Sequence, residues 1–224
     1  MRVLILITFL LTAISMSALA EERITSYGVD VTVNRDGSLD FAETIAVIGE
    51  NKNVRRGIFR YIPVVSDIEG VRVNADFEIK TVMRDGMPEP YVLERSGDRV
   101  SLRIGDPNVF IGAGTFNYTI RYRMTRQLLF YPDRDVLALS AVGTGWTFPI
   151  ENVEVTVHLP PGIQVLTVRG YTGGAGESGK DYVFRNALSG DVVIATTRRL
   201  EPLEGLSIFL AWKSGIIARG SQDL

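Results

Sequence analysis

The sequence contains no cysteine, a single histidine and only two tryptophans among its 224 residues. The absence of cysteine excludes disulfide bridges, thiolate nucleophiles, zinc–thiolate sites and lipid attachment through a thiol. The 24 basic and 26 acidic residues leave a net charge of −2, without the basic excess that is typical of nucleic-acid binding. We therefore expect no thiol chemistry and no nucleic-acid partner.

Residues 1–20 begin with a short basic start and continue into an apolar block. Arg2 precedes an apolar stretch from Val3 to Leu11, and Ala18-Leu19-Ala20 ends the segment before Glu21. This order is typical of a cleavable secretory signal peptide, and the block is shorter than the roughly 20 apolar residues that span a bilayer. We expect cleavage after Ala20 and export to the periplasm or the extracytoplasmic face of the membrane. No later apolar run predicts a transmembrane helix in the mature chain.

From residue 21 onward the hydrophobic pattern alternates with period two. Residues 29–33 alternate apolar with polar side chains, residues 34–37 (Asn-Arg-Asp-Gly) supply a turn, and residues 39–47 return along a second strand. The same alternation recurs in residues 116–122 and 153–159. Helical periodicity is not sustained for three turns anywhere, and 22 glycines and 9 prolines punctuate the chain at strand-and-turn intervals.

These patterns predict an all-β fold, an antiparallel β-sandwich, because the connections are too short for helical crossovers. We expect a single domain over residues 21–213, with two subdomains as the alternative, after the signal peptide of residues 1–20 and before a short polar tail at 214–224.

The glycine-rich run 174–180 (Gly-Ala-Gly-Glu-Ser-Gly-Lys) has the spacing of a phosphate-binding loop. Asp181 follows it where that loop needs Ser or Thr, and residues 182–184 read as a strand where it needs a helix. We expect a hairpin loop and no nucleotide. His158 shares the polar face of its strand with Glu154, and no Gly-x-Ser-x-Gly elbow supplies a serine for a catalytic triad, so we expect a solvated histidine.

Several turn residues carry oxygen atoms that could bind a ligand. Asp133 and Asp135, and Asp106 in Asp-Pro-Asn, could offer hard ligands to Ca²⁺, but such spacing is ordinary turn chemistry, and we expect no metal and no cofactor. We retain Asp106, Asp133 and Asp135, with Trp146, as candidate binding residues. Asn117 begins a formal glycosylation acceptor, but it lies in mid-strand.

Seven short motifs, in order along the chain, carry a resemblance to a known family. They are residues 34–39 (Asn-Arg-Asp-Gly-Ser-Leu), 55–63 (Arg-Arg-Gly-Ile-Phe-Arg-Tyr-Ile-Pro), 84–86 (Arg-Asp-Gly), 88–91 (Pro-Glu-Pro-Tyr), 104–107 (Ile-Gly-Asp-Pro), 118–122 (Tyr-Thr-Ile-Arg-Tyr) and 146–150 (Trp-Thr-Phe-Pro-Ile). Together they resemble the N-terminal domain of predicted membrane proteins known as domain of unknown function 2207, over nearly the whole mature chain.

That resemblance implies an extracytoplasmic β-domain, usually followed by transmembrane helices and often by a glycine-rich tail, with no established activity. Two departures from the family pattern stand out. Family members often carry Asp-Glu-Leu-Tyr-Trp-Asn where residues 135–140 here read Asp-Val-Leu-Ala-Leu-Ser. Residues 212–217 lead to a polar end at Leu224 where helices are expected, which leaves a free-standing form and a shortened gene as alternatives.

Glu43 shares the apolar face of residues 39–47 by strict alternation, although carboxylates are almost never buried without a partner. The nearest downstream cations are Lys52, Arg55, Arg56 and Arg60. Because the planar guanidinium fork can hold both carboxylate oxygens, we expect Arg56 or Arg60 to fold back and pair with Glu43. The alternative is a β-bulge that turns Glu43 to solvent.

The sequence therefore favours a non-catalytic, extracytoplasmic binding module whose partner is an envelope protein or glycan. The rival hypothesis is an envelope glycan hydrolase with Asp133 and Asp135 as acid and base. A concave cleft lined by convergent carboxylates would favour the hydrolase, and a closed sandwich would favour the module.

Overall fold

The computed structural model describes residues 21–186 and 190–219, and every regular element in them is a β-strand. The predicted signal peptide and the last five residues of the predicted tail lie outside the described residues. The strands are β1 (Arg23–Val33), β2 (Leu39–Gly49), β3 (Ile58–Pro63), β4 (Val65–Ile68), β5 (Val71–Asn74), β6 (Asp76–Arg84), β7 (Met87–Pro88), β8 (Tyr91–Ser96), β9 (Arg99–Ile104), β10 (Gly114–Thr125), β11 (Leu128–Phe130), β12 (Arg134–Val142), β13 (Val153–His158), β14 (Val165–Gly173), β15 (Tyr182–Asn186), β16 (Val192–Thr196) and β17 (Gly205–Lys213).

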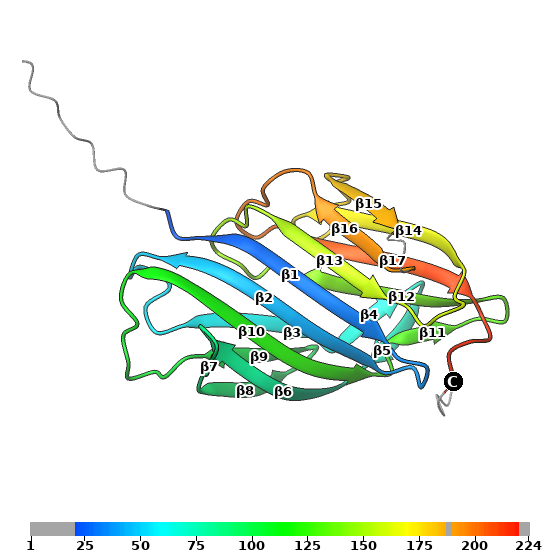
Figure 1. Cartoon of the computed structure of the whole chain (residues 1–224), viewed down its shortest axis with the longest axis horizontal. Coiled ribbons are helices and arrows are strands. Elements are labelled where there is room, and N and C mark those ends of the chain that lie inside the picture. Colours follow the sequence, from blue (N-terminus) through cyan, green and yellow to red (C-terminus); the bar gives the residue numbers. More distant parts are fainter. Residues whose placement is uncertain (1–20, 187–189, 220–224) are drawn as a thin grey trace, which may run out of the picture.

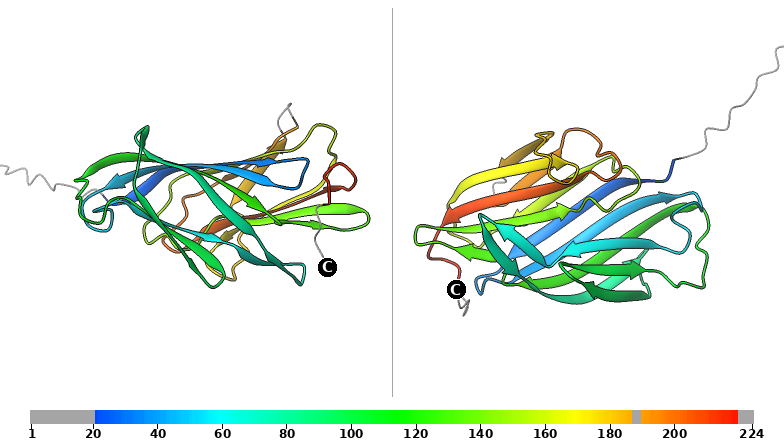
Figure 2. Two further views of the ribbon diagram at one scale, coloured as in Figure 1. Left: turned by 90° about the horizontal axis from the view of Figure 1, so that it is seen from below. Right: turned by 180° about the vertical axis from the view of Figure 1, so that it is seen from behind.

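The strands form one large sheet and three smaller ones. The large sheet has the order β15-β16-β13-β1-β2-β10-β6-β7. A four-stranded sheet (β11-β12-β17-β14) and a three-stranded sheet (β3-β9-β8) lie next to each other behind it, as the views from the front and from behind show (Figures 1 and 2). The hairpin β4-β5 is a separate two-stranded unit.

Antiparallel pairing dominates, as the short connections predict, with one exception. Strand β1 pairs with β13 in parallel, in the register Tyr27 to Val153 through Thr32 to His158. The prediction of an antiparallel sheet is wrong at this pair, because it was drawn from neighbouring strands. Strands β1 and β13 are far apart in the sequence, so all of the intervening strands can serve as the crossover that a parallel pair needs.

The core lies between the large sheet and the two sheets behind it. Inward-facing residues of β1 and β2, such as Val31 and Ile45, belong to the same buried cluster as Leu102 of β9 and Leu210 of β17. A smaller buried cluster on the four-stranded sheet joins Val73 of the β4-β5 hairpin to residues of β11, β12 and β17. The described residues contain no helix that is both long and apolar enough to span a membrane.

Candidate functional site

Glu43 of β2 and Arg60 of β3 are both buried, at 0% and 2% exposure. Arg60 donates from Nε to Oε2 of Glu43 and from Nη2 to Oε1, both at 2.8 Å. The hydroxyls of Tyr27 and Tyr122 donate to the same carboxylate at 2.6 and 2.7 Å. Both oxygens of Glu43 are therefore fully used by four hydrogen bonds.

Strand alternation explains how these side chains meet. Strand β2 keeps continuous register with β1 and with β10 around Glu43, so no β-bulge turns the carboxylate outward. In β3 the inward residues are Ile58, Arg60 and Ile62, which places the guanidinium between the two layers. Tyr27 and Tyr122 are inward residues of the strands on either side of β2.

The surroundings keep the Glu43 carboxylate ionised. Burial of the Glu43 carboxylate works to raise its pKa, but the charge of Arg60 and the three hydrogen-bonding side chains lower that pKa below its ordinary value. Burial raises the pKa of both Tyr27 and Tyr122 well above that of a free tyrosine, and the neighbouring carboxylate raises it further. Glu43 is thus a saturated structural anion, unsuited to act as a general base.

The expected pairing of Glu43 with Arg56 or Arg60 is confirmed for Arg60, and Arg56 does not take part in the pair. It precedes β3 and is exposed, with its guanidinium carbon 4.0 Å from the ring centroid of Phe110. Gly57 lies between Arg56 and the strand with φ +123°, so the chain turns before β3 begins and Arg56 stays outside the core.

A groove runs along the outer side of β3. Three neighbouring hollows of about 280, 280 and 140 Å³ all include Phe59 in their walls. We call them together the β3 groove; its walls are formed by Asn53, Val54, Arg55, Arg56, Gly57, Ile58, Phe59, Arg60, Tyr61, Pro63, Asp98, Arg99, Arg103, Pro107, Ser140, Gly143, Thr144, Gly145, Trp146, Thr147 and Phe148. It follows the seam between the three-stranded sheet and the segment after β12.

The loop that leads into β3 is held in place by Glu22. Its carboxylate accepts hydrogen bonds from the backbone N–H groups of Glu50, Lys52, Asn53 and Val54 at 2.7 to 3.2 Å. Burial works to raise the pKa of Glu22, but these four N–H groups lower it below the ordinary value. An ionised carboxylate therefore fixes the segment that presents Arg55 and Arg56.

Two glycines then let this loop touch the end of β9. A Cβ on Gly57 would lie 1.8 Å from the carbonyl oxygen of Ile104, and a Cβ on Gly105 would lie 1.9 Å from that of Arg56. Both glycines have positive φ, at +123° and +118°. Only glycine fits this close approach of two backbones.

The groove is rich in cations without acidic partners. Within residues 21–186 and 190–219, the guanidinium groups of Arg55, Arg56, Arg99 and Arg103 have no carboxylate oxygen within 4.0 Å. Arg55 and Arg56 lie over the ring of Phe110, and Arg99 lies over the ring of Tyr61. Sequence reasoning did not select these residues as a binding site, although the alternation in residues 58–63 places Phe59 and Tyr61 outward whenever Arg60 points inward.

Trp146, a candidate binding residue, lies at the inner wall of this groove. It is 5% exposed and packs edge-on against Tyr27, with ring centroids 5.8 Å apart. Its carbonyl oxygen accepts the backbone N–H of Leu203. Trp146 therefore supports the groove from below more than it offers a contact surface.

Residues 23–212 match the family described as "Predicted membrane protein (DUF2207) N-terminal domain". The match covers most of the chain and includes all seven motifs. The chain belongs to the DUF2207 N-terminal domain family.

One relative in this comparison is the "Uncharacterized protein YciQ" of Escherichia coli strain K12. It is 31% identical over 131 residues, which make up 58% of this chain and 21% of YciQ. The chain thus spans about a fifth of the length of that relative.

Solved structures resemble the DUF2207 domain in fold alone. Native yeast LTA4 hydrolase aligns with a TM-score of 0.50 at 8% identity, over 85% of this chain and 29% of that one. An M1 zinc metallopeptidase from Deinococcus radiodurans aligns with a TM-score of 0.43 at 14% identity, over 84% of this chain and 42% of that one. At this identity the likeness carries no information on chemistry.

The candidate carboxylates of the DUF2207 domain do not converge. Asp133 lies in the turn between β11 and β12, its side chain 76% exposed and 3.6 Å from Nη1 of Arg134. Asp106 accepts the backbone N–H of Asn108 in a local turn. Neither residue lines the β3 groove, and among the described residues no group of three or more His, Asp or Glu side chains could hold a metal.

Asp135, unlike Asp133, is buried. It is 1% exposed, and neither of its oxygens has a hydrogen-bond partner among the described residues. Burial raises its pKa above the ordinary value, although the charge of Arg219 and the nearby indole N–H of Trp212, its cross-strand neighbour, lower it in part. A buried, poorly satisfied carboxylate destabilises the fold when ionised.

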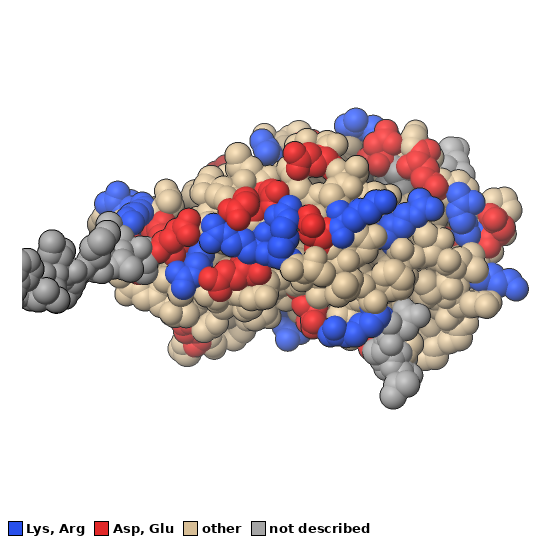
Figure 3. All heavy atoms as spheres, turned by 90° about the horizontal axis from the view of Figure 1, so that it is seen from above, with Lys and Arg blue, Asp and Glu red and all other residues tan. Residues whose placement is uncertain are grey.

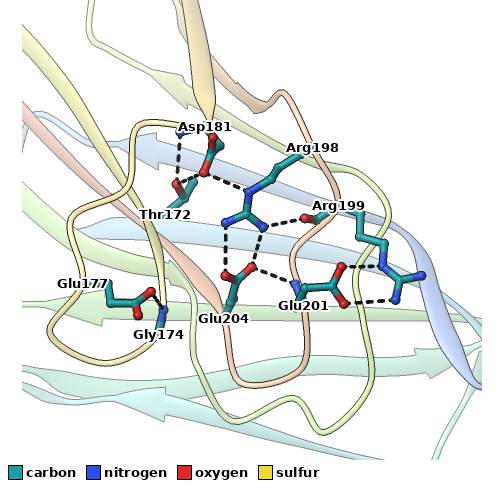
Figure 4. A network of polar contacts seen from close by, with 8 residues as sticks. All are labelled: Thr172, Gly174, Glu177, Asp181, Arg198, Arg199, Glu201 and Glu204. Atoms are coloured by element: carbon teal, nitrogen blue, oxygen red, sulfur yellow. Dashed lines mark hydrogen bonds and ion pairs between the residues drawn. The ribbon is translucent and has the colours of Figure 1, made fainter.

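The glycine-rich loop is filled by its own side chain. Oε2 of Glu177 accepts the backbone N–H of Gly174 at 2.8 Å. The adjacent Arg198 pairs with Asp181 and with both oxygens of Glu204 (Figure 4).

Seen from above, acidic and basic side chains interleave along the molecule (Figure 3).

His158 lies at the end of β13, with its two ring nitrogens 3.4 Å from Asp30 and 3.2 Å from Asp191. The side chain is 39% exposed. Both of these neighbours are carboxylates, which fits a histidine on a solvated strand face.

Proposed function

We propose that this DUF2207 domain is a non-catalytic extracytoplasmic β-sandwich, exported by its signal peptide, that binds an anionic partner in the cell envelope through the β3 groove. The observation that carries the proposal is the set of four arginines, Arg55, Arg56, Arg99 and Arg103, that line the groove without acidic partners. Arg123 and Arg198 on other surfaces are matched by carboxylates. Arg72, Arg121 and Arg169 also lack a carboxylate within 4.0 Å among the described residues, but they lie on three different strands and line none of the three hollows.

Arginines that gather in one groove without acidic partners are typical of a surface that binds an anionic ligand. A guanidinium group stays charged at every physiological pH and binds carboxylates and phosphates through two parallel hydrogen bonds. Exposed apolar rings within the same groove, above all Phe59 at 51% exposure, add a contact surface that a solvated charged face does not need.

The rival hydrolase lacks support in the geometry. Its proposed acid and base are Asp133 in an exposed turn and Asp135 inside the core, and neither lines the groove. The buried carboxylate of Glu43 already accepts hydrogen bonds from Arg60 and two tyrosines. A glycosidase needs two carboxyl groups that flank one bond of the substrate.

The proposal is tested by retention of the exported protein on isolated envelope material. The groove variant replaces Arg55, Arg56 and Arg103 with alanine; the control replaces three exposed arginines of other surfaces, Arg72, Arg121 and Arg169, so that the net charge changes equally. We expect the wild type and the control to be retained and the groove variant to bind at least tenfold more weakly.

Two outcomes overturn the proposal. Equal retention of all three proteins, or retention of none, removes the groove as a binding site. Release of reducing sugar ends by the wild type, lost in Asp133→Asn or Asp135→Asn, establishes the hydrolase in its place.

A further inference from the structure

The β3 groove has two chemically different parts arranged along one strand. At one end, Arg55, Arg56 and Arg103 surround a hollow of about 280 Å³ with Phe59 and Pro107. Toward the other end of β3, Arg99, Tyr61 and Pro63 line the other hollow of about 280 Å³. The register places Phe59 opposite Arg103 and Pro63 opposite Arg99, so cations recur along the length of the strand pair.

The charge in the groove is strongly one-sided. Asp98 is the one carboxylate among the residues that form its described walls, and it lies in the same hollow as Arg99. Arg60 is neutralised by Glu43 beneath the surface. The three arginines of the first hollow therefore present an uncompensated positive field to solvent.

Two aromatic side chains of β3, Phe59 and Tyr61, contribute to the walls of the groove beside these cations. Phe59 and Tyr61 point outward two residues apart, with ring centroids 6.4 Å apart and planes within 15° of each other. Phe59 is half exposed. An aromatic face with its negative quadrupole packs well against the C–H groups on one side of a sugar ring.

An acidic peptide fits this groove less well. Peptides commonly bind the edge of a sheet by adding a strand, and β3 is an edge strand. At Tyr61, however, the carbonyl oxygen accepts Nη1 of Arg60, and a Cβ on Gly145 would lie 2.8 Å from the tyrosine ring. An added strand at Tyr61 would therefore have to displace the Arg60 hydrogen bond and the segment that packs on the tyrosine ring.

A membrane surface fits less well too. Phe110 is 55% exposed and stands at the end of the groove, where an apolar ring could insert between lipids. Its face is covered by the guanidinium groups of Arg55 and Arg56, at 5.2 and 4.0 Å from the ring centroid. Insertion of this ring would require two charged groups to leave it or to enter the bilayer with it.

We propose that the β3 groove binds a linear anionic glycan. A sugar ring packs on Phe59, and carboxylate or phosphate groups of successive sugars bind Arg55, Arg56 and Arg103 at one end and Arg99 at the other. The inference rests on the proposed function, since it names the ligand class of the same groove.

The test measures binding of defined chains to the exported protein by calorimetry at physiological salt. The probes are an oligogalacturonate, a dextran phosphate of similar length, unmodified dextran, an oligoglutamate and vesicles that contain anionic lipid. We expect binding of at least one anionic glycan, no binding of dextran, and weaker binding as salt is raised, because the attraction is between exposed charges.

Matched variants locate the site. We expect at least a tenfold loss of glycan affinity in the Arg55, Arg56 and Arg103 groove variant, and a loss of several-fold in Phe59→Ala. Phe184→Ala removes a ring of similar exposure, 53%, from β15 and should change nothing, as should the Arg72, Arg121 and Arg169 control.

The outcomes separate this inference from the proposed function. Groove-dependent binding of oligoglutamate or vesicles, without binding of either anionic glycan, overturns the glycan and leaves an anion-binding groove. Glycan affinity equal in wild type and Phe59→Ala overturns the ring contact. If neither the probes nor the envelope material distinguishes the groove variant from its control, both proposals fail.

Discussion

Arg60 joins Glu43 through two hydrogen bonds of 2.8 Å between side chains that are 2% and 0% exposed. Glu43 belongs to the large sheet, and Arg60 belongs to the three-stranded sheet behind it. Nη2 of Arg60 also donates to the carbonyl oxygen of Ala141 in β12, at 3.3 Å. One guanidinium group therefore ties three sheets together at the base of the groove.

The replacement Glu43→Ala should lower the free energy of unfolding by about 3–5 kcal/mol, because it leaves the Arg60 charge buried without a partner. The exposed Glu78→Ala, which removes a surface pair with Lys80, should cost less than about 1 kcal/mol. Denaturant titration of the two variants measures the difference. A midpoint for Glu43→Ala equal to that of the wild type would show that the pair adds nothing to stability.

The Glu43–Arg60 pair also predicts that the protein loses stability at low pH. The pKa of Glu43 is lower in the fold than its ordinary value of 4.5. Its contribution is therefore fully present above the pKa of the unfolded chain and is lost as the pH falls through the folded pKa. Unfolding free energies measured from pH 7 downward should fall more steeply below about pH 4.5 in the wild type than in Glu43→Gln. Parallel profiles for the two proteins contradict this.

For Asp135 we expect the stability to depend on pH in the direction opposite to that for Glu43. Because burial raises its pKa above 3.8, the ionised side chain destabilises the fold above the folded pKa, and the penalty disappears as the pH falls toward the unfolded value. Asp135→Asn should therefore raise the melting temperature at pH 7 and have a smaller effect at pH 4. Loss of stability at pH 7 would instead indicate that the carboxylate has a partner that the asparagine cannot replace.

Gly57→Ala should destabilise the protein and displace the loop that carries Arg55 and Arg56. Its Cβ would collide with the carbonyl oxygen of Ile104, 1.8 Å away. Gly86→Ala is the matched control, since Gly86 also has positive φ, +80°, but has open space around it. We expect a cost of about 1 kcal/mol for Gly86→Ala, which reflects backbone strain alone, and clearly more for Gly57→Ala. Thermal melts of both variants decide it, and equal melting temperatures would refute the close contact.

Local patterns were enough to predict the strands with clear alternation and the inward position of Glu43. Alternation in residues 29–33 and 39–47 predicted the hairpin of β1 and β2, and the same period placed Glu43 on the inward face. The pattern could not choose between Arg56 and Arg60, because the choice depends on where β3 begins. The positive φ of Gly57 decides that point, and it reflects contact with the end of β9.

The sequence by itself determined the all-β class, the family and the need for a buried cation beside Glu43, since each of these follows from short-range periodicity, motif order or the cost of an unpaired charge. Only the tertiary structure decided the parallel pairing of β1 with β13, the burial of Asp135 beside Trp212 of β17, and the meeting of Arg55, Arg56 and Arg103 around Phe59. These three relationships join residues far apart in the chain. Their partners are set by how the sheets pack, and period-two alternation specifies which face a residue takes but not which strand lies beside it.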